Sequence, residues 1–501
     1  MIEDLKLFIN GVFIESTTDT KMDIYDPSIG EVIARTPCCT EAEVNAAIVA
    51  ANDAFPAWAD TPCTQRVEVL YRFRDLLMMH LDELTHTLCR ENGKNWDEAR
   101  GDLLKVKEHV EVACGAPSLT MGEALMNVTP GFDSVLYREP LGVFVGIAPF
   151  NFPAMIPMGW MMPMCIATGN TLILKASSLT PMTSLRLAGL LKEAGLPDGV
   201  VNVVTCSRNE AELFLTHPDV KGVTLVGSTT IGKHVYAAAA ANGKRVQALC
   251  EAKNHALVLE DANISKTAAG IINSAFGCAG ERCMALPAIA VQESIADALV
   301  DEILHQLKSQ TIGAAYDKTT DLGPLVSAGQ KQWVNDWINK GIAEGATLVL
   351  DGRGITVQGY EKGFFVGHTI FDNVTEDMSI GQEEIFGPVL CIKRVKDFEE
   401  GLAIMNANRF ANGSVIFTQN GYYAREFTKR THGGMVGINV GIPVPVGIFP
   451  FAGHKDSFFG DLHCLGKDGL RFYTESKVVT TRWFHEEEKT QTKVSTWDGA
   501  M

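Results

Sequence analysis

The chain has 501 residues, of which 46% are apolar and 21% are charged, and its formal net charge is −17. This length suits two or three globular domains with a buried core. The acidic balance disfavours nucleic acid and anionic membrane surfaces as partners. The start "MIEDLKLFIN" lacks the basic and apolar parts of a signal peptide, so we expect a cytoplasmic protein with reduced thiols.

The cysteine spacing disfavours a metal-binding protein, and the apolar runs disfavour a membrane-spanning one. The twelve cysteines are scattered without a CxxC pair or zinc-finger spacing, so no metal site is predicted. The most apolar window, 152–169, contains three prolines and two glycines. That content predicts the start of a buried helix and disfavours a membrane span.

The first third of the chain is predicted to be helical. Apolar residues recur every three or four positions over 41–59 and over 63–92. A short pair of strands is expected within 134–149. Helical segments at 184–195 and 210–218 then separate segments that are typical of buried strands. These strands are expected at 171–176, 200–205, 222–227 and 255–260.

A second alternating block runs from about 264 to 440, with strands such as "ALPAIAVQ", "ATLVLDG" and "GSVIFTQ". Strands that alternate with helices predict an α/β fold with a parallel sheet covered on both faces. Two such units in sequence predict a ligand cleft between them.

The segment 222–240, "GVTLVGSTTIGKHVYAAAA", is expected to form a strand, a glycine-bearing turn and a helix. Such a turn offers backbone amides and a helix N-terminus to a phosphate. It nearly matches GxxxxGK[ST], but His234 follows Lys233, so the hydroxyl that would bind Mg²⁺ is missing. A nucleoside triphosphatase is therefore disfavoured, whereas a dinucleotide site and a plain turn both stay open.

The stretch "AFGCAGERCMALP" (275–287) contains a candidate nucleophile, Cys283. The neighbouring Arg282 favours the thiolate, which is the reactive form of the side chain. A buried structural cysteine is the competing interpretation, and it suits Cys278 better because that residue lacks a charged neighbour.

Two polar side chains follow predicted strands. Asn151, in "IAPFNFPAMIP", is placed either to donate a hydrogen bond to an oxyanion or to cap the next helix. Lys175 ends the strand "TLILK", where it reaches either a ribose or phosphate group or only solvent.

Five motifs in order, "PFNFP", "GNTLILK", "GSTTIG", "GERC" and "EEIFGPV", resemble those of the aldehyde dehydrogenase superfamily over nearly the whole chain. The resemblance implies that Cys283 is the nucleophile and that Asn151 donates to the oxyanion beside the backbone N–H of Cys283. It also implies a Rossmann-type NAD-binding domain, an α/β catalytic domain and a small β oligomerisation ribbon. The implied cofactor contacts are Phe150, Lys175, Ser178, Gly227, Ser228, Gly232, Glu384 and Phe386.

The same resemblance implies a division of the chain and an assembly. The expected dinucleotide-binding domain comprises 1–124 and 143–250, and the catalytic domain comprises 251–440. The ribbon and C-terminal segment comprise 125–142 and 441–485, and 486–501 is expected to be a flexible tail. Pairing of ribbon strands between subunits implies a homodimer or homotetramer.

The chain departs from most members of the superfamily at the residue that activates water. The usual motif Glu-Leu-Gly-Gly-Lys aligns with "LCEAKNH" (249–255), so Leu249 occupies the place of the glutamate. Leucine cannot accept a proton, so a more acidic acceptor than water is implied, and coenzyme A fits. With "APFNFPAM" and "PVPVGIFPFAGHKDSFFGD" (443–461), this departure resembles the methylmalonate-semialdehyde dehydrogenases. The resemblance implies oxidation of malonate semialdehyde or its 2-methyl analogue to acetyl-CoA or propionyl-CoA.

Two rival functions stay open. In an extended segment Glu251 would share a face with Leu249, so it could act as the base of a hydrolytic enzyme for another acid semialdehyde. The remoter alternative is a non-catalytic dinucleotide-binding protein.

Two further departures concern the ligands. Arg282 can bind the carboxylate of a semialdehyde in a bidentate manner, and Lys105 stands where the related enzymes have a second arginine. Ser178, in "KASS", replaces a glutamate that would hold the adenosine ribose. That glutamate would also repel the 2′-phosphate of NADP, so its loss leaves NADP as an alternative to NAD, the cofactor that the resemblance implies.

Overall fold

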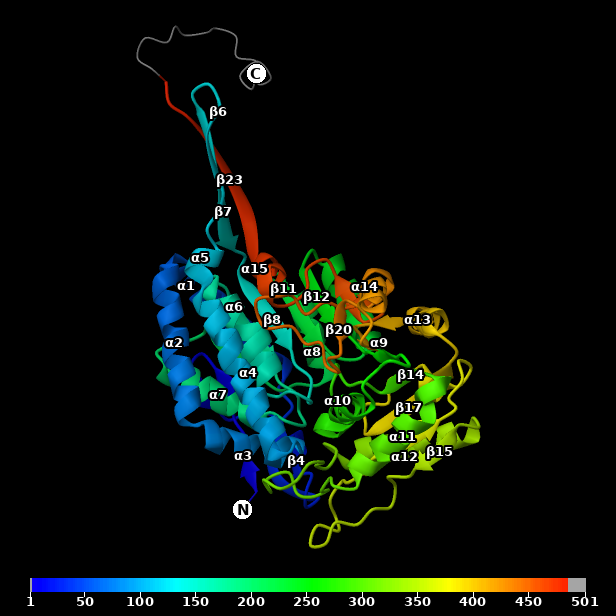
Figure 1. Ribbon diagram of the computed structural model, residues 1–501. Helices are drawn as coiled ribbons and strands as arrows, with labels where there is room; N and C mark the ends of the chain where they lie inside the picture. The colour runs from blue at the N-terminus through cyan, green and yellow to red at the C-terminus, as the bar shows by residue number, and fades with distance from the viewer. Residues whose placement is uncertain (1, 485–501) are drawn as a thin grey trace.

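The computed structural model describes residues 2–484, which form two large sheets with covering helices and a narrow ribbon (Figure 1). The first sheet has the strand order β22-β12-β11-β8-β9-β10-β2-β3. Its five central strands are parallel and form buried apolar runs, as expected for a sheet covered on both faces. They are β12 (Arg245–Leu249), β11 (Val220–Val226), β8 (Val143–Ile147), β9 (Thr171–Lys175) and β10 (Val201–Val204). The edges are antiparallel and comprise β2 (Leu7–Ile9), β3 (Val12–Ile14) and β22 (Phe458–Gly460).

The predicted N-terminal helices are confirmed, with one break. The expected helix over 63–92 is interrupted at His80, which ends α2 and precedes α3. A capping box between Thr40 and Glu43 begins the first helix of the chain. The helices of this half are α1 (Glu41–Asp60), α2 (Cys63–Met79), α3 (Leu81–Asn92), α4 (Trp96–Cys114), α5 (Ala116–Leu119), α6 (Met162–Ala167), α7 (Met182–Glu193), α8 (Arg208–Thr216) and α9 (Thr229–Ala241).

The apolar window 152–169 is buried, as predicted. It forms a π-helical segment, η1 (Met155–Met161), which continues directly into α6. Among the helices of residues 2–484, none is long and apolar enough to cross a membrane.

The second sheet has the order β15-β16-β17-β14-β13-β19-β20 and is parallel except at the β15 edge. Its strands are β15 (Thr347–Leu350), β16 (Thr369–Asp372), β17 (Val389–Val395), β14 (Ala288–Gln292), β13 (His255–Val258), β19 (Gly413–Phe417) and β20 (Met435–Ile438). Its helices are α10 (Ile264–Phe276), α11 (Glu293–Leu307), α12 (Ala328–Ala343), α13 (Phe398–Ala407) and α14 (Gly421–Arg430). The predicted second α/β block is therefore confirmed, but it begins earlier than expected, because the strand expected at 255–260 with the first block is β13 of the second sheet.

The strand pair predicted within 134–149 is wrong. The two strands exist, but Gly142, at φ +136°, turns the chain between them into different sheets. The earlier strand, β7 (Phe132–Pro140), joins β6 (Ala124–Thr129) and β23 (Thr474–Arg482) in a three-stranded ribbon that projects from the body (Figure 1). The later strand, β8, pairs with β9 and β11 in the first sheet.

The C-terminal segment returns to the body before it reaches the ribbon. β22 lines the edge of the first sheet beside β12, and α15 (Gly466–Phe472) leads into β23. Small sheets of β1 (Glu3–Asp4), β4 (Lys21–Asp26) and β5 (Glu31–Pro37), and of β18 (Phe410–Ala411) and β21 (His454–Lys455), complete the described strands. The tail expected at 486–501 lies outside the described residues.

One short connection joins the two large sheets. β12 ends at Leu249, and β13 begins at His255 in the centre of the second sheet. The intervening residues 250–254 therefore lie where the two halves of the molecule meet, and the candidate site is built around them.

Candidate active site

The turn before Cys283 has an unusual backbone. After α10, the short 3-10 segment η2 (Gly277–Gly280) contains three consecutive residues with positive φ: Cys278 at 52°, Ala279 at 50° and Gly280 at 73°. A Cβ atom at Gly280 would overlap the carbonyl group of Gly387, so glycine is required there. Consecutive left-handed residues are costly outside glycine and cluster at functional sites.

Two side chains hold this turn through its backbone. Glu98, in α4, accepts a hydrogen bond from the Cys278 amide at 2.6 Å. The Asn254 carboxamide donates to the carbonyls of Cys283 at 2.9 Å and Ala285 at 2.7 Å, and it accepts from the Gly413 amide at 2.7 Å. The bonding capacity of Asn254 is thus used to fix the backbone of Cys283.

The expectation that Arg282 makes Cys283 a thiolate is not met in this structure. Burial, together with the negative charge of Glu384, raises the pKa of the Cys283 thiol to about 12. Arg282 acts in the opposite direction, but its effect on this pKa is smaller than that of burial. Burial therefore favours the protonated thiol over the thiolate at this position.

Asn151 lies at the end of the segment that follows β8 and is buried, with 3% of its surface exposed. Among residues 2–484 its carboxamide has no hydrogen-bond partner, and the helical segment η1 is capped by Ala154 without a side-chain bond. The capping interpretation is therefore not supported. The carboxamide lines the same cavity as Cys283 and is free to donate to a ligand.

The backbone around Asn151 is held by buried polar groups of the helices. Lys94 and Asp102 form an ion pair at 2.9 Å, with side chains 2% and 0% exposed. The Lys94 ammonium donates to the Asn151 carbonyl, and the Asp102 carboxylate accepts from the Met155 amide at 2.6 Å. Asn92 adds a hydrogen bond of 2.9 Å to the preceding carbonyl, that of Phe150.

A cavity of about 390 Å³ lies between the two halves of the molecule and contains most of the predicted site residues. The predicted residues that line it are Phe150, Asn151, Lys175, Ser178, Gly227, Ser228, Cys283, Glu384 and Phe386. They come from the first sheet's carboxyl edge and from the loops of the second unit, which is where α/β proteins bind nucleotides.

The lining suits a dinucleotide. Ser228 caps α9, and a Cβ atom added at Gly227 would meet no atom closer than 3.9 Å, so backbone faces open cavity there. Phe386, at φ 58°, packs edge-on against Phe150 with ring centroids 5.7 Å apart. Burial raises the pKa of Glu384 to about 8, although its carboxylate accepts a 2.9 Å bond from the Ala252 amide. Aromatic walls, a phosphate cradle and a hydroxyl acceptor are therefore all present.

Three predicted residues do not line this cavity. The Arg282 guanidinium donates to the carbonyls of Asn273 and Ser274. Lys105 forms an ion pair with Glu108 on its own helix. Gly232 packs against the side chain of Cys250, with which a Cβ atom would overlap. Close helix packing, and not ligand contact, accounts for glycine at position 232.

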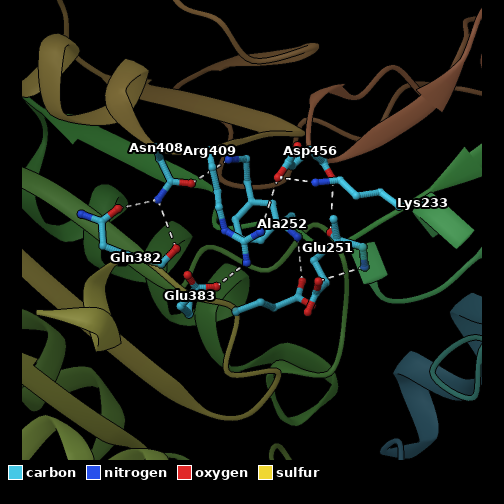
Figure 2. A network of polar contacts seen from close by, with 11 residues as sticks. Lys233, Glu251, Ala252, Gln382, Glu383, Asn408, Arg409 and Asp456 are labelled. Atoms are coloured by element: carbon cyan, nitrogen blue, oxygen red, sulfur yellow. Dashed lines mark hydrogen bonds and ion pairs between the residues drawn. The ribbon is translucent and has the colours of Figure 1, made fainter. Parts of the chain in front are cut away.

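The place of the usual water-activating glutamate is apolar. Leu249 is 4% exposed and packs into the core. Glu251 lines the cavity, and its carboxylate accepts a hydrogen bond of 2.9 Å from the Thr229 amide at the start of α9 (Figure 2). Glu251 is thus engaged at the end of the cavity formed by the N-terminus of α9.

Sequence reasoning missed the residues that hold the site. Lys94, Asp102, Asn254 and Glu98 act through backbone groups that are distant in the chain. Only weak hints of these roles are present in the sequence. Lys94 follows Gly93, the glycine that ends α3. Asn254 lies in the motif "AKNH", next to Lys253, which is also buried.

The fold and this site define an aldehyde dehydrogenase, and the chain belongs to that family, because the aldehyde dehydrogenase family model matches residues 13–479. A malonate-semialdehyde dehydrogenase of Bacillus mycoides is 45% identical over 482 residues, which cover 96% of this chain and 99% of that protein. One from Geobacillus thermodenitrificans is 45% identical over 483 residues, covering 96% and 99%.

Two solved structures agree closely with this fold. The methylmalonate-semialdehyde dehydrogenase of Oceanimonas doudoroffii has a TM-score of 0.95 at 43% identity, with 97% of this chain and 99% of that chain covered. A Sinorhizobium meliloti protein assigned to the same activity, and solved with NAD, has a TM-score of 0.95 at 41% identity and the same coverage.

Proposed function

We propose that the protein is an NAD-dependent, CoA-acylating dehydrogenase of malonate semialdehyde or its 2-methyl analogue. The products are acetyl-CoA or propionyl-CoA, formed with loss of the substrate carboxylate. The observation that carries the proposal is a cavity in which Cys283 and Asn151 meet a dinucleotide cradle, while the apolar Leu249 stands in place of a base. The relatives named above support the choice of substrate and cofactor.

Cys283 and Asn151 have different roles in the oxidation. The Cys283 thiol loses its proton to water in the open cavity, and the resulting thiolate adds to the aldehyde carbonyl. The Asn151 carboxamide and the Cys283 backbone amide donate hydrogen bonds to the oxygen that becomes negative. Oxidised NAD, when bound, brings a positive charge into the cavity and accepts the hydride. An acyl thioester on Cys283 remains.

The thioester then determines the two remaining steps. A carboxylate β to the thioester carbonyl leaves as CO₂, because the carbonyl takes up the electron pair as an enolate that is then protonated. The thiolate of coenzyme A attacks the acyl carbon, a new C–S bond forms, and the bond to the Cys283 sulfur breaks. A thiolate needs no general base at the position of Leu249, whereas water does.

The rival hydrolytic function requires Glu251 to activate water. Its carboxylate instead accepts a hydrogen bond from the Thr229 amide, at the phosphate end of the cavity. No observation favours hydrolysis over thiolysis.

Recognition of the substrate carboxylate is assigned to Arg282. Its Nε is buried and has no hydrogen-bond partner in the described part of the chain. For this role the guanidinium has to leave the carbonyls of Asn273 and Ser274 and turn toward the cavity. Lys105 carries the second positive charge, provided that it leaves Glu108. NAD is the cofactor in this proposal; Ser178, which lines the cavity, carries no charge that would repel the 2′-phosphate of NADP.

The ribbon is proposed to mediate assembly into a homodimer or homotetramer. β23 pairs with β7 along its whole length, and the exposed apolar side chains Leu125, Met126 and Val478 leave an apolar surface on the projecting strands.

Product analysis tests the proposal. The enzyme is incubated with NAD, coenzyme A and either malonate semialdehyde, methylmalonate semialdehyde or succinate semialdehyde, and acyl-CoA products are identified by mass spectrometry. We expect acetyl-CoA and propionyl-CoA from the first two substrates. Free carboxylic acids as the main products would contradict the proposal.

A further inference from the structure

The dinucleotide cavity contains a carboxylate at its phosphate-binding end. Glu251 lies two residues beyond β12 and lines the cavity together with Gly227 and Ser228. Its Oε2 accepts a hydrogen bond of 2.9 Å from the backbone amide of Thr229 (Figure 2). Thr229 is the first residue of α9. The side chain therefore occupies an amide that would otherwise be open to an anionic ligand.

The neighbouring cations are committed to other carboxylates. Asp456 binds Lys233 at 3.1 Å and Arg409 at 3.4 Å, and Arg409 also binds Glu383 at 2.5 Å (Figure 2). Glu251 forms no ion pair with any residue in 2–484. Its charge also disfavours ionisation of Glu384, the other carboxylate in the cavity, because it contributes to the raised pKa of that residue.

A bound dinucleotide brings two negative charges to the same place. The pyrophosphate of NAD gains from the amides and the dipole at a helix N-terminus, and a carboxylate gains in the same manner. Two anions beside one helix end repel each other, and they compete for the same donors.

We propose that the Glu251 carboxylate competes with the dinucleotide pyrophosphate for the N-terminal end of α9, and so lowers the affinity of the protein for NAD and NADH alike. The inference rests on the proposed function, because it takes this cavity to be the dinucleotide site. It assigns to Glu251 the role of setting cofactor affinity, in place of the role of a base. Weaker binding of NADH means faster release, which clears the cavity in each cycle.

Isothermal titration of wild-type protein and of Glu251→Gln tests the proposal. Glutamine keeps the size and the acceptor for the Thr229 amide but removes the charge. The probes are NADH, ADP-ribose and adenosine, which separate the pyrophosphate from the nucleoside. We expect Glu251→Gln to bind NADH and ADP-ribose about five- to tenfold more tightly, with no change for adenosine.

Asp456→Asn is the matched control, since it removes one negative charge from the same network but outside the cavity. We expect its affinity for ADP-ribose to stay within about twofold of wild type. Equal affinities of wild type and Glu251→Gln for ADP-ribose would overturn the proposal, and so would an equal gain for adenosine or in Asp456→Asn. If neither the wild-type protein nor the variant binds NADH and ADP-ribose, the proposed function itself is overturned, and this inference with it.

Discussion

The segment that carries Asn151 and the turn that carries Cys283 reach one cavity but are held in different ways. The backbone around Asn151 is fixed by Asn92, Lys94 and Asp102, which lie on α3, on the loop that follows it and on α4, all in the same half of the molecule. The turn before Cys283 has a left-handed backbone, and Glu98 holds it from the opposite half. Asn254, directly before β13, also holds the Cys283 carbonyl, so only the start of this turn depends on a contact between the halves. The backbone of the proposed oxyanion donor is thus held from one half, whereas the turn of the proposed nucleophile is held from both.

This difference has a chemical meaning. A hydrogen-bond donor to an oxyanion contributes most when it does not have to reorganise during the reaction. The largest effects should therefore follow from changes to the two reacting side chains, and smaller ones from changes to their supports.

Replacing the nucleophile removes the covalent route. We expect Cys283→Ala to lose at least about 10⁴-fold in NADH formation, because the variant lacks the sulfur that bonds to the aldehyde carbon. Loss of NAD binding should not accompany it, as measured by titration. Hydride transfer at a measurable rate in the variant would contradict the assignment of Cys283.

Replacing the oxyanion donor should weaken the reaction without changing the thiol. We expect Asn151→Ala to lower kcat by about 10²–10³-fold, while iodoacetamide labels Cys283 at the wild-type rate. A variant in which labelling and kcat fall together would show that Asn151 acts on the nucleophile and not on the oxyanion.

The buried ion pair of Lys94 and Asp102 is predicted to support catalysis by holding the backbone around Asn151 in place. Lys94→Met leaves Asp102 unpaired, so we expect a loss of about 3–5 kcal/mol in the free energy of unfolding and of about 10-fold in kcat. The double variant Lys94→Met/Asp102→Leu removes the unpaired charge and serves as the control. Urea unfolding should show recovered stability, whereas kcat should stay low because the backbone at 151–155 has lost both supports. Full kcat in the double variant would refute the positioning role.

The smallest predicted effect concerns pH. Burial raises the pKa of Glu384 from its ordinary value of 4.5 to about 8, so the native state holds this proton more firmly than the unfolded state does. Stability is lost as pH rises through that interval. Glu384→Gln should therefore match wild type in Tm near pH 4.5 and exceed it by about 2–4 °C near pH 8.5. A difference in Tm that does not grow with pH would contradict the raised pKa.

Much of the fold and of the candidate site could be predicted from the sequence. Hydrophobic periodicity predicted the helices and both α/β blocks, because segments buried on both faces read as continuous apolar runs. Motif order predicted that Cys283, Asn151 and Glu384 would line one cavity. These features depend on local sequence or on a pattern shared with a family.

What the sequence could not supply depends on distant contacts. Strands β7 and β8 look like a local pair, but β23, more than 300 residues later, takes β7 into the ribbon. The neighbour Arg282 suggested a thiolate, yet burial by the folded chain determines the pKa of Cys283. Likewise, only the packing of α9 against residues 250–251 shows why position 232 is a glycine and where Glu251 lies.

Rapid mixing of enzyme, NAD and malonate semialdehyde without coenzyme A tests the central claim most directly. The account predicts a burst of about one NADH per active site, followed by a near halt that coenzyme A relieves, because the acyl group on Cys283 has no base to activate water. Continued release of carboxylic acid at the full rate, with no coenzyme A present, would contradict it.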